Sequence, residues 1–436
     1  MKFTLQEFEK KIRNKEITIA VVGLGYVGLP LAVEFARKGI DVLGIEIDKG
    51  RIEKIKKEES YITDISTQEL KEVIRSGKFH AESDFIALKK AQVIIICVPT
   101  PLKKKYTPDI SFIKSAVKEI SKHMAKGALV ILESTTFPGT TNEVILPLLE
   151  TKGRIHGEDF YLSFSPERID PGNAAFPVNK IPKVVGGINA DATERSRLVY
   201  SIIIDKVIPV SSSRVAETVK LLENTFRIVN IGLIDEIAMM AHKMKVDIWE
   251  IVEAAKTKPF GFMPFYPGPG VGGHCIPKDP LYLFWKAKKF GFHSRFIKLA
   301  SDIITHMPGY VVDRVKELLA ERKTDLVKSR VLVMGVTYKK DIMDLRQSPP
   351  LDIIKILQDK KVNVSYYDPI IPYLKFSGIN LKSVSLNAET LKKFDCVVIA
   401  TDHSSVDYEL LRKHSKLIFD TRNVYKNVKD SKVTKL

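Results

Sequence analysis

Residues 17–48, which read ITIAVVGLGYVGLPLAVEFARKGIDVLGIEID, decide the fold. Residues 17–22 have the length and the β-branched content of a buried strand. A glycine-rich turn follows, and then an amphipathic helix through about Lys38. A second apolar strand ends at Glu46. This alternation of strand and helix predicts a parallel, doubly wound α/β sheet.

The pattern continues along the chain in three parts. Apolar runs at residues 93–98, 129–132 and 160–164 predict further strands of the first sheet. From residue 211 to 256 we expect one long helical segment, and more helix to about Glu321. Its apolar residues recur at helical spacing: Val215, Leu222, Phe226, Val229, Leu233, Ile237 and Met240. A second αβ unit follows, with SRVLVMGVTYK, VNVSYYDP and CVVIAT as strands and SPPLDIIKILQDKK as a helix.

The glycine-rich turn Gly23-Leu-Gly-Tyr-Val-Gly28 has the pattern G-x-G-x-x-G between a strand and a helix, where it binds a dinucleotide. Its glycines permit a tight turn, and the helix N-terminus binds the pyrophosphate. Glu46 is expected to bind the ribose hydroxyls of NAD and to repel the 2′-phosphate of NADP. Arg51 lies nearby in the sequence and could accommodate that phosphate, so NADP stays an alternative cofactor. The alternative is an accidental glycine-rich turn.

Composition excludes few classes by itself. The chain has 436 residues, more than one compact core needs, and a formal net charge of +17. Its lysines are interleaved with acidic residues, which favours solvated helix faces over nucleic-acid binding, although an anionic substrate would also fit. We expect no signal peptide and no membrane span. Three distant cysteines predict neither a disulfide framework nor a zinc site, and they favour a reducing cytoplasm.

One cysteine has unusual neighbours. Cys275 lies in GPGVGGHCIPKDP, among glycines and next to polar residues, whereas Cys97 and Cys396 lie in apolar runs typical of packed, inert thiols. From these residues alone, Cys275 is either a nucleophile or a packed loop thiol. His274 is a weak candidate for a general base, because adjacent residues seldom point the same way. Lys278 is interpreted as a loop charge.

Several separated motifs carry a resemblance to a known family. They are GLGYVGLPLA, SPERIDPGN, KLLENTF, GPGVGGHCIPKDP and GVTYKKDIMDLRQSP. Together they resemble the nucleotide-sugar 6-dehydrogenases, over residues 17–424. The resemblance implies an NAD-binding Rossmann domain (1–210), a helical middle domain with the cysteine loop (211–321) and a C-terminal Rossmann-like UDP-sugar domain (322–436). It also implies two NAD per product, no metal, and a dimer or larger oligomer with the long helix at the interface.

The reaction of that family explains why a cysteine is needed. Oxidising an alcohol to an acid takes two hydride transfers, and an aldehyde loses hydride readily only after a nucleophile adds to it. The resemblance gives this role to Cys275. It gives oxyanion stabilisation to Lys220, and it gives Asn224 the holding of substrate or water. Asp279 would orient the lysine and water, and Glu167 would be the general base in thioester hydrolysis.

The bland alternatives are a solvated helix face for Lys220 and Asn224, and a surface ion pair for Glu167. Thr135 is expected at the water and cofactor site and is counted with the catalytic residues. The predicted cofactor site comprises Gly23, Gly25, Tyr26, Val27, Gly28, Glu46, Arg51, Thr100, Thr135 and Arg346. The predicted substrate site comprises Glu167, Arg168, Lys220, Asn224, Phe265, Gly270 and Lys339.

Two motifs narrow the set of candidate substrates. SPERIDPGN and FYPGPGVGGHCIP look like those of the UDP-N-acetylhexosamine branch, and the run Asp-Pro-Gly-Asn at 170–173 looks most like the UDP-N-acetylglucosamine 6-dehydrogenases. UDP-N-acetylmannosamine is close behind, and UDP-N-acetylgalactosamine and UDP-glucose remain alternatives. Three rival classes are a non-catalytic sensor, a polyanion-binding protein and a single-step β-hydroxyacid dehydrogenase. The sensor would be expected to lose the cysteine, the lysine or the aspartate, and the dehydrogenase would need no cysteine.

Overall fold

The structure, a computed structural model, describes residues 4–62, 64–103, 107–168 and 178–436. The chain divides into two compact units, Met1–Glu223 with Trp285–Phe292, and Asn224–Phe284 with His293–Leu436. Helices α8 (Ser213–Lys243) and α10 (Asp279–Lys288) have residues in both units. The predicted domain limits, after residues 210 and 321, differ from the limits of these units and stay a prediction.

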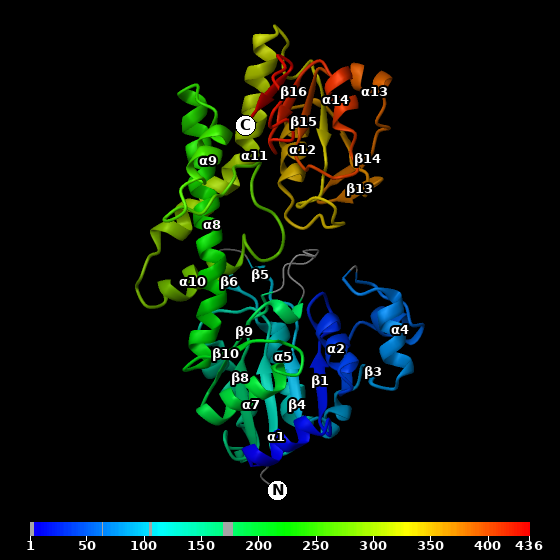
Figure 1. The fold of residues 1–436 in the computed structure, drawn as a ribbon, viewed down its shortest axis with the longest axis vertical. Coiled ribbons are helices and arrows are strands. Elements are labelled where there is room, and N and C mark those ends of the chain that lie inside the picture. Colours follow the sequence, from blue (N-terminus) through cyan, green and yellow to red (C-terminus); the bar gives the residue numbers. More distant parts are fainter. Residues whose placement is uncertain (1–3, 63, 104–106, 169–177) are drawn as a thin grey trace. The chain divides into compact units, whose positions relative to one another are not determined.

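The first unit is built on an eight-stranded sheet with the order β10-β9-β8-β7-β4-β1-β2-β3 (Figure 1). Neighbouring strands are parallel except β8 and β9, which are antiparallel. The strands expected from the apolar runs are all present, and the parallel, doubly wound sheet is confirmed. The strands are β1 (Thr18–Val22), β2 (Asp41–Ile45), β3 (Phe79–Glu82), β4 (Val93–Ile96), β7 (Ala128–Leu132), β8 (Phe160–Phe164), β9 (Lys183–Gly187) and β10 (Val207–Pro209), with a separate β5–β6 pair (Leu102–Lys103, Thr107–Pro108).

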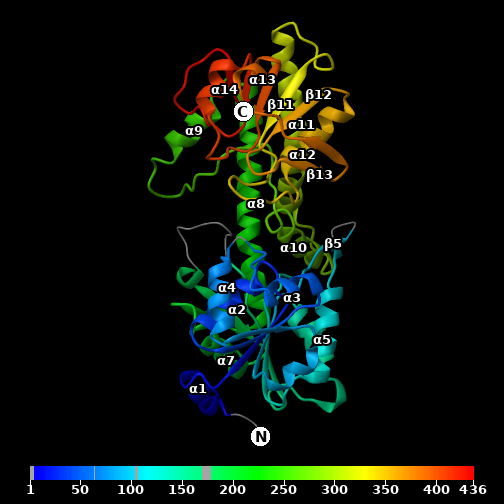
Figure 2. The ribbon, with the colours of Figure 1, turned by 90° about the vertical axis from the view of Figure 1, so that its right-hand side faces the viewer.

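Helices cover both faces of this sheet (Figure 2). Successive side chains of a strand point to opposite faces, so Val21 joins the core under α1, α2, α4 and α7, while Val22 joins the core under α5 and α6. The helical elements are α1 (Leu5–Arg13), α2 (Gly28–Arg37), α3 (Lys49–Lys56), α4 (Thr67–Arg75), η1 (Phe85–Lys90), α5 (Ser111–His123), η3 (Thr141–Ile145), α6 (Leu146–Leu149), η4 (Thr151–Gly153), η5 (Val178–Lys180) and α7 (Ala190–Tyr200).

The second unit holds a five-stranded sheet, all parallel, in the order β12-β11-β15-β16-β17. Val333 packs toward α11 and α12, and Met334 packs on the opposite face among residues of α13 and α14. This confirms the expected second Rossmann-like unit. Its elements are α9 (Ile248–Ala255), α11 (Arg295–Glu321), β11 (Arg330–Met334), α12 (Pro349–Asp359), β12 (Asn363–Tyr367), β13 (Tyr373–Phe376), β14 (Ile379–Lys382), α13 (Ala388–Lys392), β15 (Cys396–Ile399), α14 (Tyr408–His414), β16 (Ile418–Asp420) and β17 (Val433–Lys435).

The helical segment expected over residues 211–256 is present as two helices. Helix α8 ends at Lys243, and α9 begins at Ile248. Lys245 between them adopts a left-handed conformation, with φ of +59°. Asp247 then caps α9, because its side chain accepts hydrogen bonds from the N–H groups of Trp249 and Glu250. The left-handed turn at Lys245 thus ends α8 and the Asp247 cap starts α9, without any glycine or proline between the two helices.

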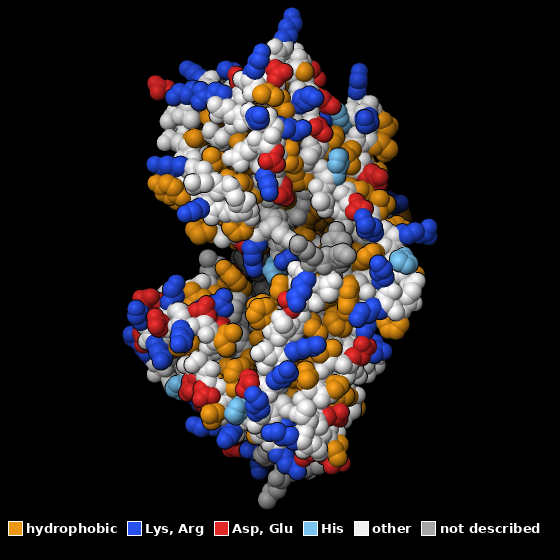
Figure 3. Space-filling model, turned by 180° about the vertical axis from the view of Figure 1, so that it is seen from behind, with side chains coloured by type: hydrophobic (Ala, Val, Ile, Leu, Met, Phe, Trp, Pro, Cys, Tyr) orange, Lys and Arg blue, Asp and Glu red, His pale blue; other side chains and the backbone are white. Residues whose placement is uncertain are grey.

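One face of the protein carries its charges in a mixed pattern. On the described part of the face in Figure 3, Lys and Arg side chains lie among acidic and apolar ones, with no continuous basic region. This agrees with the interpretation of the +17 charge as solvated faces. Among the helices that the structure describes, none is long and apolar enough to cross a membrane.

An added side chain would meet a very close contact at Gly28 of the first unit. A Cβ built on Gly28 would lie 1.9 Å from the carbonyl oxygen of Gly23, a backbone atom that cannot move without opening the turn. We therefore expect Gly28→Ala to lower the stability of the cofactor-free protein by about 2–3 kcal/mol, the usual cost of overpacking a well-packed site.

Thermal unfolding of the two variants Gly28→Ala and Gly25→Ala measures this. At Gly25 the added Cβ would meet nothing nearer than the Arg51 Nη1 atom at 4.0 Å, so Gly25→Ala is the matched control and should unfold near the wild-type temperature. Equal midpoints for both variants would contradict the close packing at Gly28.

Candidate active site

The glycine-rich loop lies where the strand order of the first sheet reverses. Strand β1 lies between β4 and β2, so the loop after β1 opens at the carboxyl ends of the strands, beside the end of β4. In open α/β sheets this is where ligands bind. Gly23 donates its N–H to the Ile45 carbonyl at 2.8 Å. Thr100 is buried just beyond β4, while Tyr26 is half exposed.

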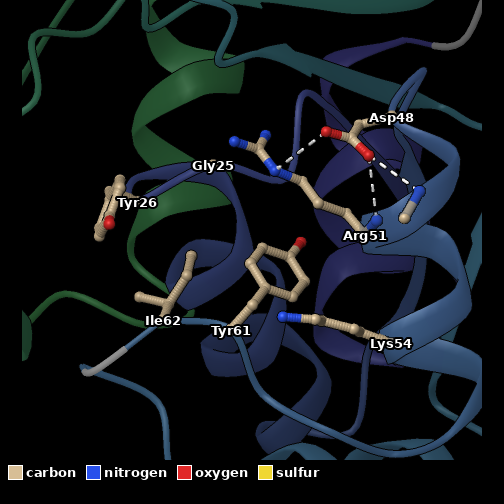
Figure 4. A pocket seen from close by; sticks show the side chains of 8 residues that line it. Gly25, Tyr26, Asp48, Arg51, Lys54, Tyr61 and Ile62 are labelled. Carbon is tan, nitrogen blue, oxygen red and sulfur yellow. Dashed lines mark hydrogen bonds and ion pairs between the residues drawn. The ribbon is translucent and has the colours of Figure 1, made fainter. Parts of the chain in front are cut away.

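A pocket of about 350 Å³ opens beside this loop. It is lined by Gly25, Tyr26, Asp48, Gly50, Arg51, Lys54, Tyr61 and Ile62. Figure 4 shows the side chains of Arg51, Lys54 and Tyr61 close to one another. The would-be Cβ of Gly25 faces open space apart from Arg51, so a ligand can approach the loop backbone closely. These residues fit a dinucleotide.

Glu46 is buried and already holds three protein donors. Its Oε2 accepts from the Leu24 N–H and from Arg51 Nη1, both at 3.0 Å, and its Oε1 accepts from the Asp48 N–H at 3.0 Å. The side chain thus ties the glycine-rich loop to the start of α3, a contact that the sequence did not predict. Its expected bond to the cofactor ribose stays a prediction.

A second group of side chains gathers at the carboxyl ends of β7 and β8. Glu167 and the half-buried Thr135, both predicted from the sequence, follow these strands. Three buried residues that the sequence analysis missed lie with Glu167: Glu133, Lys183 and Tyr200. Lys183 contacts Glu133 directly, and its Nζ lies 3.2 Å from Glu167 Oε2. Tyr200 donates its hydroxyl to Glu133 Oε2 at 2.5 Å.

Arg168 lies beside this group. Its N–H donates to Glu167 Oε1 at 2.6 Å, and its guanidinium pairs with Glu223 of α8 at 2.6 Å. The arginine therefore connects the loop after β8 to the long helix. The run at residues 170–173, from which we predicted N-acetylglucosamine, lies outside the described residues.

Lys220 lies half-buried on α8, three residues after a buried acid. Glu217 accepts hydrogen bonds from the N–H groups of Gly139 and Thr141 and from the Thr141 hydroxyl at 2.7 Å. Burial raises the pKa of Glu217 to about 7, although these hydrogen bonds favour its charged form. Glu217 thereby fixes α8 to the turn that follows Thr135.

The cysteine loop belongs to the second unit. Cys275 is exposed, and its carbonyl accepts from the N–H groups of Lys278 and Asp279 at 3.0 and 2.8 Å. Asp279 is buried at the start of α10, and its Oδ2 accepts from Asn224 Nδ2 at 2.5 Å. Within this unit the structure brings together three of the predicted catalytic residues: Cys275, Asn224 and Asp279.

The same loop is fastened to the loop after β11. Gly273 donates its N–H to the Arg346 carbonyl at 3.0 Å. A Cβ on Gly273 would lie 2.8 Å from the Tyr338 ring, and the residue has φ of +86°, so only glycine fits here. Tyr338 immediately precedes Lys339, a predicted substrate residue. The cysteine loop and this predicted nucleotide-binding segment are therefore in contact, which the sequence did not indicate.

Four further predicted residues have clear surroundings. Phe265 packs edge-on against Phe226, with the ring centres 5.9 Å apart. Arg346 is exposed and forms an ion pair with Asp344 at 2.6 Å. Lys339 and Gly270 are half-buried.

Burial lowers the pKa values of two neighbours of Cys275, His274 and Lys278. Burial lowers the pKa of His274 to about 4, and the charges of Lys278 and Arg346 add to this effect. An imidazole with so low a pKa is a weak base, which agrees with the interpretation of His274 as a weak candidate for a general base. Lys278 is half-buried, and burial followed by Arg346 lowers its pKa, so it is more than the loop charge we expected.

The other two thiols are packed, as predicted. Cys396 is fully buried, and burial raises its pKa to about 12. Cys97 is half-buried. Burial raises its pKa, and the charge of Glu133 adds to this rise. High pKa values leave both as thiols at neutral pH.

Comparison with known proteins gives three successive family matches. The NAD binding domain of the UDP-glucose/GDP-mannose dehydrogenase family matches residues 17–204, its central domain matches 214–304, and its UDP binding domain matches 332–427. An oxidoreductase that acts on nucleotide sugars with NAD is the class of protein that these matches and the fold define. The chain belongs to the UDP-glucose/GDP-mannose dehydrogenase family.

Individual relatives include dehydrogenases of two UDP-N-acetylhexosamines. A UDP-N-acetyl-D-mannosamine dehydrogenase of Pyrococcus horikoshii is 38% identical over 94% of this chain and 96% of its own length. A UDP-N-acetyl-D-glucosamine 6-dehydrogenase of Pseudomonas aeruginosa is 39% identical over 81% of this chain and 83% of its own. The solved structure of the UDP-D-ManNAc dehydrogenase of Pyrococcus horikoshii has a TM-score of 0.87 and 36% identity, covering 96% of this chain and 99% of its own.

The start of the cysteine loop is held by a buried acid. Asp235 of α8 accepts the Gly268 N–H on Oδ1 at 3.0 Å, and its side chain is fully buried. Burial raises the pKa of Asp235 to about 8, while the bond from Gly268 and the charge of Arg422 oppose this rise only in part. The folded protein therefore holds a proton here that the unfolded chain loses near pH 4.

Replacement by asparagine tests this. The proton on Asp235 stabilises the fold below pH 4, and this stabilisation is lost as the pH rises to about 8. Asp235→Asn keeps an oxygen acceptor without the charge, so its thermal midpoint relative to wild type should rise across that window and then level off. Glu236→Gln, at the exposed neighbouring position of α8, is the control for replacing an acid by its amide in this helix. A flat Asp235→Asn difference would contradict the raised pKa.

Proposed function

We propose that this protein oxidises the C6 alcohol of a UDP-N-acetylhexosamine to the uronate, with two NAD reduced per sugar. One observation carries the proposal: an exposed cysteine in a glycine loop that is tied to Asp279, within a chain that belongs to this family. Such a thiol is what a four-electron oxidation needs, and a single-step dehydrogenase has no use for it.

Each proposed catalytic residue has one task. The Cys275 thiolate adds to the C6 aldehyde and makes a thiohemiacetal, whose carbon then has a hydride to lose. Lys220 offsets the negative charge on oxygen, and Asn224 and Asp279 hold the substrate and the attacking water. Glu167 takes the proton of the water that cleaves the thioester. Thr135 contacts the water and the cofactor.

NAD supplies the hydride acceptor for both oxidation steps. The loop from Gly23 to Gly28, with Gly25, Tyr26 and Val27 between them, would hold its pyrophosphate, and Glu46 and Arg51 would hold its adenosine half. Thr100 and Arg346 would complete the site. For the sugar nucleotide we propose Arg168, Phe265, Gly270 and Lys339 in addition to the catalytic groups.

UDP-N-acetylglucosamine is the first choice of substrate. The sequence run at residues 170–173 and the relative from Pseudomonas aeruginosa support it. UDP-N-acetylmannosamine is the second candidate, because the chain covers more of the Pyrococcus horikoshii relative and has a high structural similarity to it. The two substrates differ only in configuration at C2, so a direct comparison is required.

The experiment supplies NAD with UDP-N-acetyl derivatives of glucosamine, mannosamine and galactosamine, and with UDP-glucose. It measures kcat/KM for each and the NADH formed per sugar consumed. We expect UDP-N-acetylglucosamine to give the highest kcat/KM, with two NADH per sugar and no accumulation of aldehyde. A ratio of one NADH, or no turnover with any of the four, would refute the four-electron reaction.

Cys275→Ser should lower steady-state NADH formation by at least about 1,000-fold. A serine alkoxide forms far less readily than a thiolate, and an ester is cleaved more slowly than a thioester. Substrate and NAD binding, measured by calorimetry, should change little because serine nearly preserves the shape. Cys396→Ser is the matched control at a buried thiol and should retain two NADH per sugar. Wild-type turnover by Cys275→Ser would make Cys275 a packed loop thiol.

We also propose that α8 forms the interface of a homodimer. Phe226, Leu233 and Met240 recur at intervals of seven residues on this helix, and each remains about half exposed, at 48%, 53% and 49%. Large apolar side chains exposed in a row on one helix usually mark an interaction surface. The family resemblance implies a second copy of this chain as the partner.

Light scattering at micromolar protein should give the mass of a dimer or a larger oligomer. Leu233→Glu should lower that mass, because it places a charge in the centre of an apolar contact. Arg227→Gln is the control, since residue 227 is turned about 100° from Phe226 around the helix. A monodisperse wild-type monomer would rule out this interface.

A further inference from the structure

Three charged side chains meet at the edge of the first sheet for a topological reason. The parallel strands β7 and β8 bring their carboxyl ends to one edge, and the antiparallel β9 starts there. In the β8–β9 register Phe164 pairs with Gly186, and continuing that register sets Glu167 opposite Lys183. Glu133 follows β7 directly. Two carboxylates and one ammonium group are therefore placed together by the strand pairing itself.

Ion pairs join Glu133, Glu167 and Lys183 into one cluster. Lys183 forms ion pairs with both carboxylates, to Glu133 Oε1 and to Glu167 Oε2, the latter at 3.2 Å. Glu133 is fully buried, Lys183 is 7% exposed, and Glu167 is 13% exposed, so Glu167 is the member closest to solvent. A cavity of about 20 Å³ touches Glu167, Lys183 and Tyr200, which is room for one water molecule.

Among the residues that the structure describes, the groups around this cluster do not supply a second cation beside the two carboxylates. Tyr200 of α7 donates to Glu133, and burial followed by Glu133 raises its pKa, so it stays protonated. Burial likewise raises the pKa of the Cys97 thiol beyond β4. Arg168 directs its guanidinium to Glu223, and only its backbone N–H reaches Glu167. The buried unit would thus carry a net negative charge if both carboxylates were ionised.

An uncompensated charge in a buried site is costly, and a proton is the cheapest way to remove it. Burial, which Lys183 opposes and Glu167 reinforces, raises the pKa of Glu133 to about 7. Burial alone would lower the pKa of Lys183, but the two carboxylates outweigh it and the net shift is upward. At neutral pH the pair therefore gains or loses one proton while the lysine keeps its charge.

We propose that Glu133 and Lys183 are positioning residues that set the base strength of Glu167, with one proton shared between the two carboxylates. The inference rests on the proposed role of Glu167 in thioester hydrolysis. In that step the oxygen of water bonds to the thioester carbon, one proton of the water passes to Glu167, and the C–S bond breaks with its electron pair left on the Cys275 sulfur. Protonation of the pair weakens the base, whichever carboxylate holds the proton.

The kinetic test measures uronate release in a single turnover by rapid quench, between about pH 5 and 9. The wild-type rate should fall on the acidic side with an apparent pKa near 7. Glu133→Gln removes the second carboxylate, so this inflection should move to lower pH by about one unit or more. Lys183→Met removes the cation and should move the inflection to higher pH by a similar amount. Lys183→Arg keeps the charge and should restore the wild-type profile.

Opposite shifts distinguish this role from a merely structural one, which would lower the rate and the thermal midpoint in both variants without moving the inflection. Lys180→Met is the matched control, because Lys180 lies three residues earlier and pairs with the exposed Asp205 at 2.7 Å. Its profile should not move. Shifts in one direction, or none in a folded Glu133→Gln protein, overturn the proposal. If Lys183→Met does not fold, the Glu133→Gln profile alone decides.

An infrared titration decides the proton location without any turnover. The carbonyl band of a protonated carboxylic acid, in the spectrum of wild type minus Glu133→Gln, should disappear as the pH rises through about 7. Subtraction removes the contributions of other buried acids. If no UDP-sugar is oxidised but this band titrates, the proposed function fails and the shared proton stands. If the enzyme turns over and the band is missing, the inference fails and the function stands.

Discussion

Buried carboxylates that accept backbone N–H groups hold the loops of both units in place. Loops at the ends of parallel strands have N–H groups without a strand partner, and burying such a group unpaired is costly. In this chain acidic side chains take those bonds: Glu46, Glu217, Asp235, Asp368 and Asp420. Four loops with proposed site residues, those of Gly23, Thr135, Cys275 and Lys339, start or end close to one of these acids.

This way of fixing loops has an electrostatic cost. A carboxylate in a dry site is held by hydrogen bonds from N–H groups, yet desolvation favours its neutral form. Burial wins at Glu217 and Asp235, whose pKa values rise to about 7 and 8. At Asp368, hydrogen bonds from His403 and from three backbone N–H groups outweigh burial, and its pKa falls below the usual value. At Asp420 burial raises the pKa although several backbone N–H groups donate to it, so the balance between burial and hydrogen bonds differs from one acid to the next.

The sequence predicted those parts of the molecule whose signal is local. Continuous apolar runs indicated the central strands, and the spacing of Gly23, Gly25 and Gly28 indicated the cofactor loop. Strands β9 and β10 were missed because their signal is weak: β9 contains two glycines, and the edge strand β10 has three residues that end in Pro209. The resemblance named Cys275 with Asn224 and Asp279, and it named Glu167, but it did not name the buried partners of Glu167. Glu133 and Lys183 have no local signal, because Lys183 reaches Glu167 only through the antiparallel register of β8 and β9, and Glu133 joins them through the parallel pairing of β7 with β8.

That register also explains why two carboxylates serve better than one. With Lys183 alone, Glu167 would form a neutral ion pair, its pKa would be depressed, and it would be a weak base. Without Lys183, two buried carboxylates would face each other and one would stay protonated far above neutral pH. The lysine and the second acid oppose one another, and the pair titrates near the pH at which an enzyme works. The base strength proposed for Glu167 thus follows from the antiparallel pairing of β8 with β9, in a sheet whose other neighbouring strands are parallel.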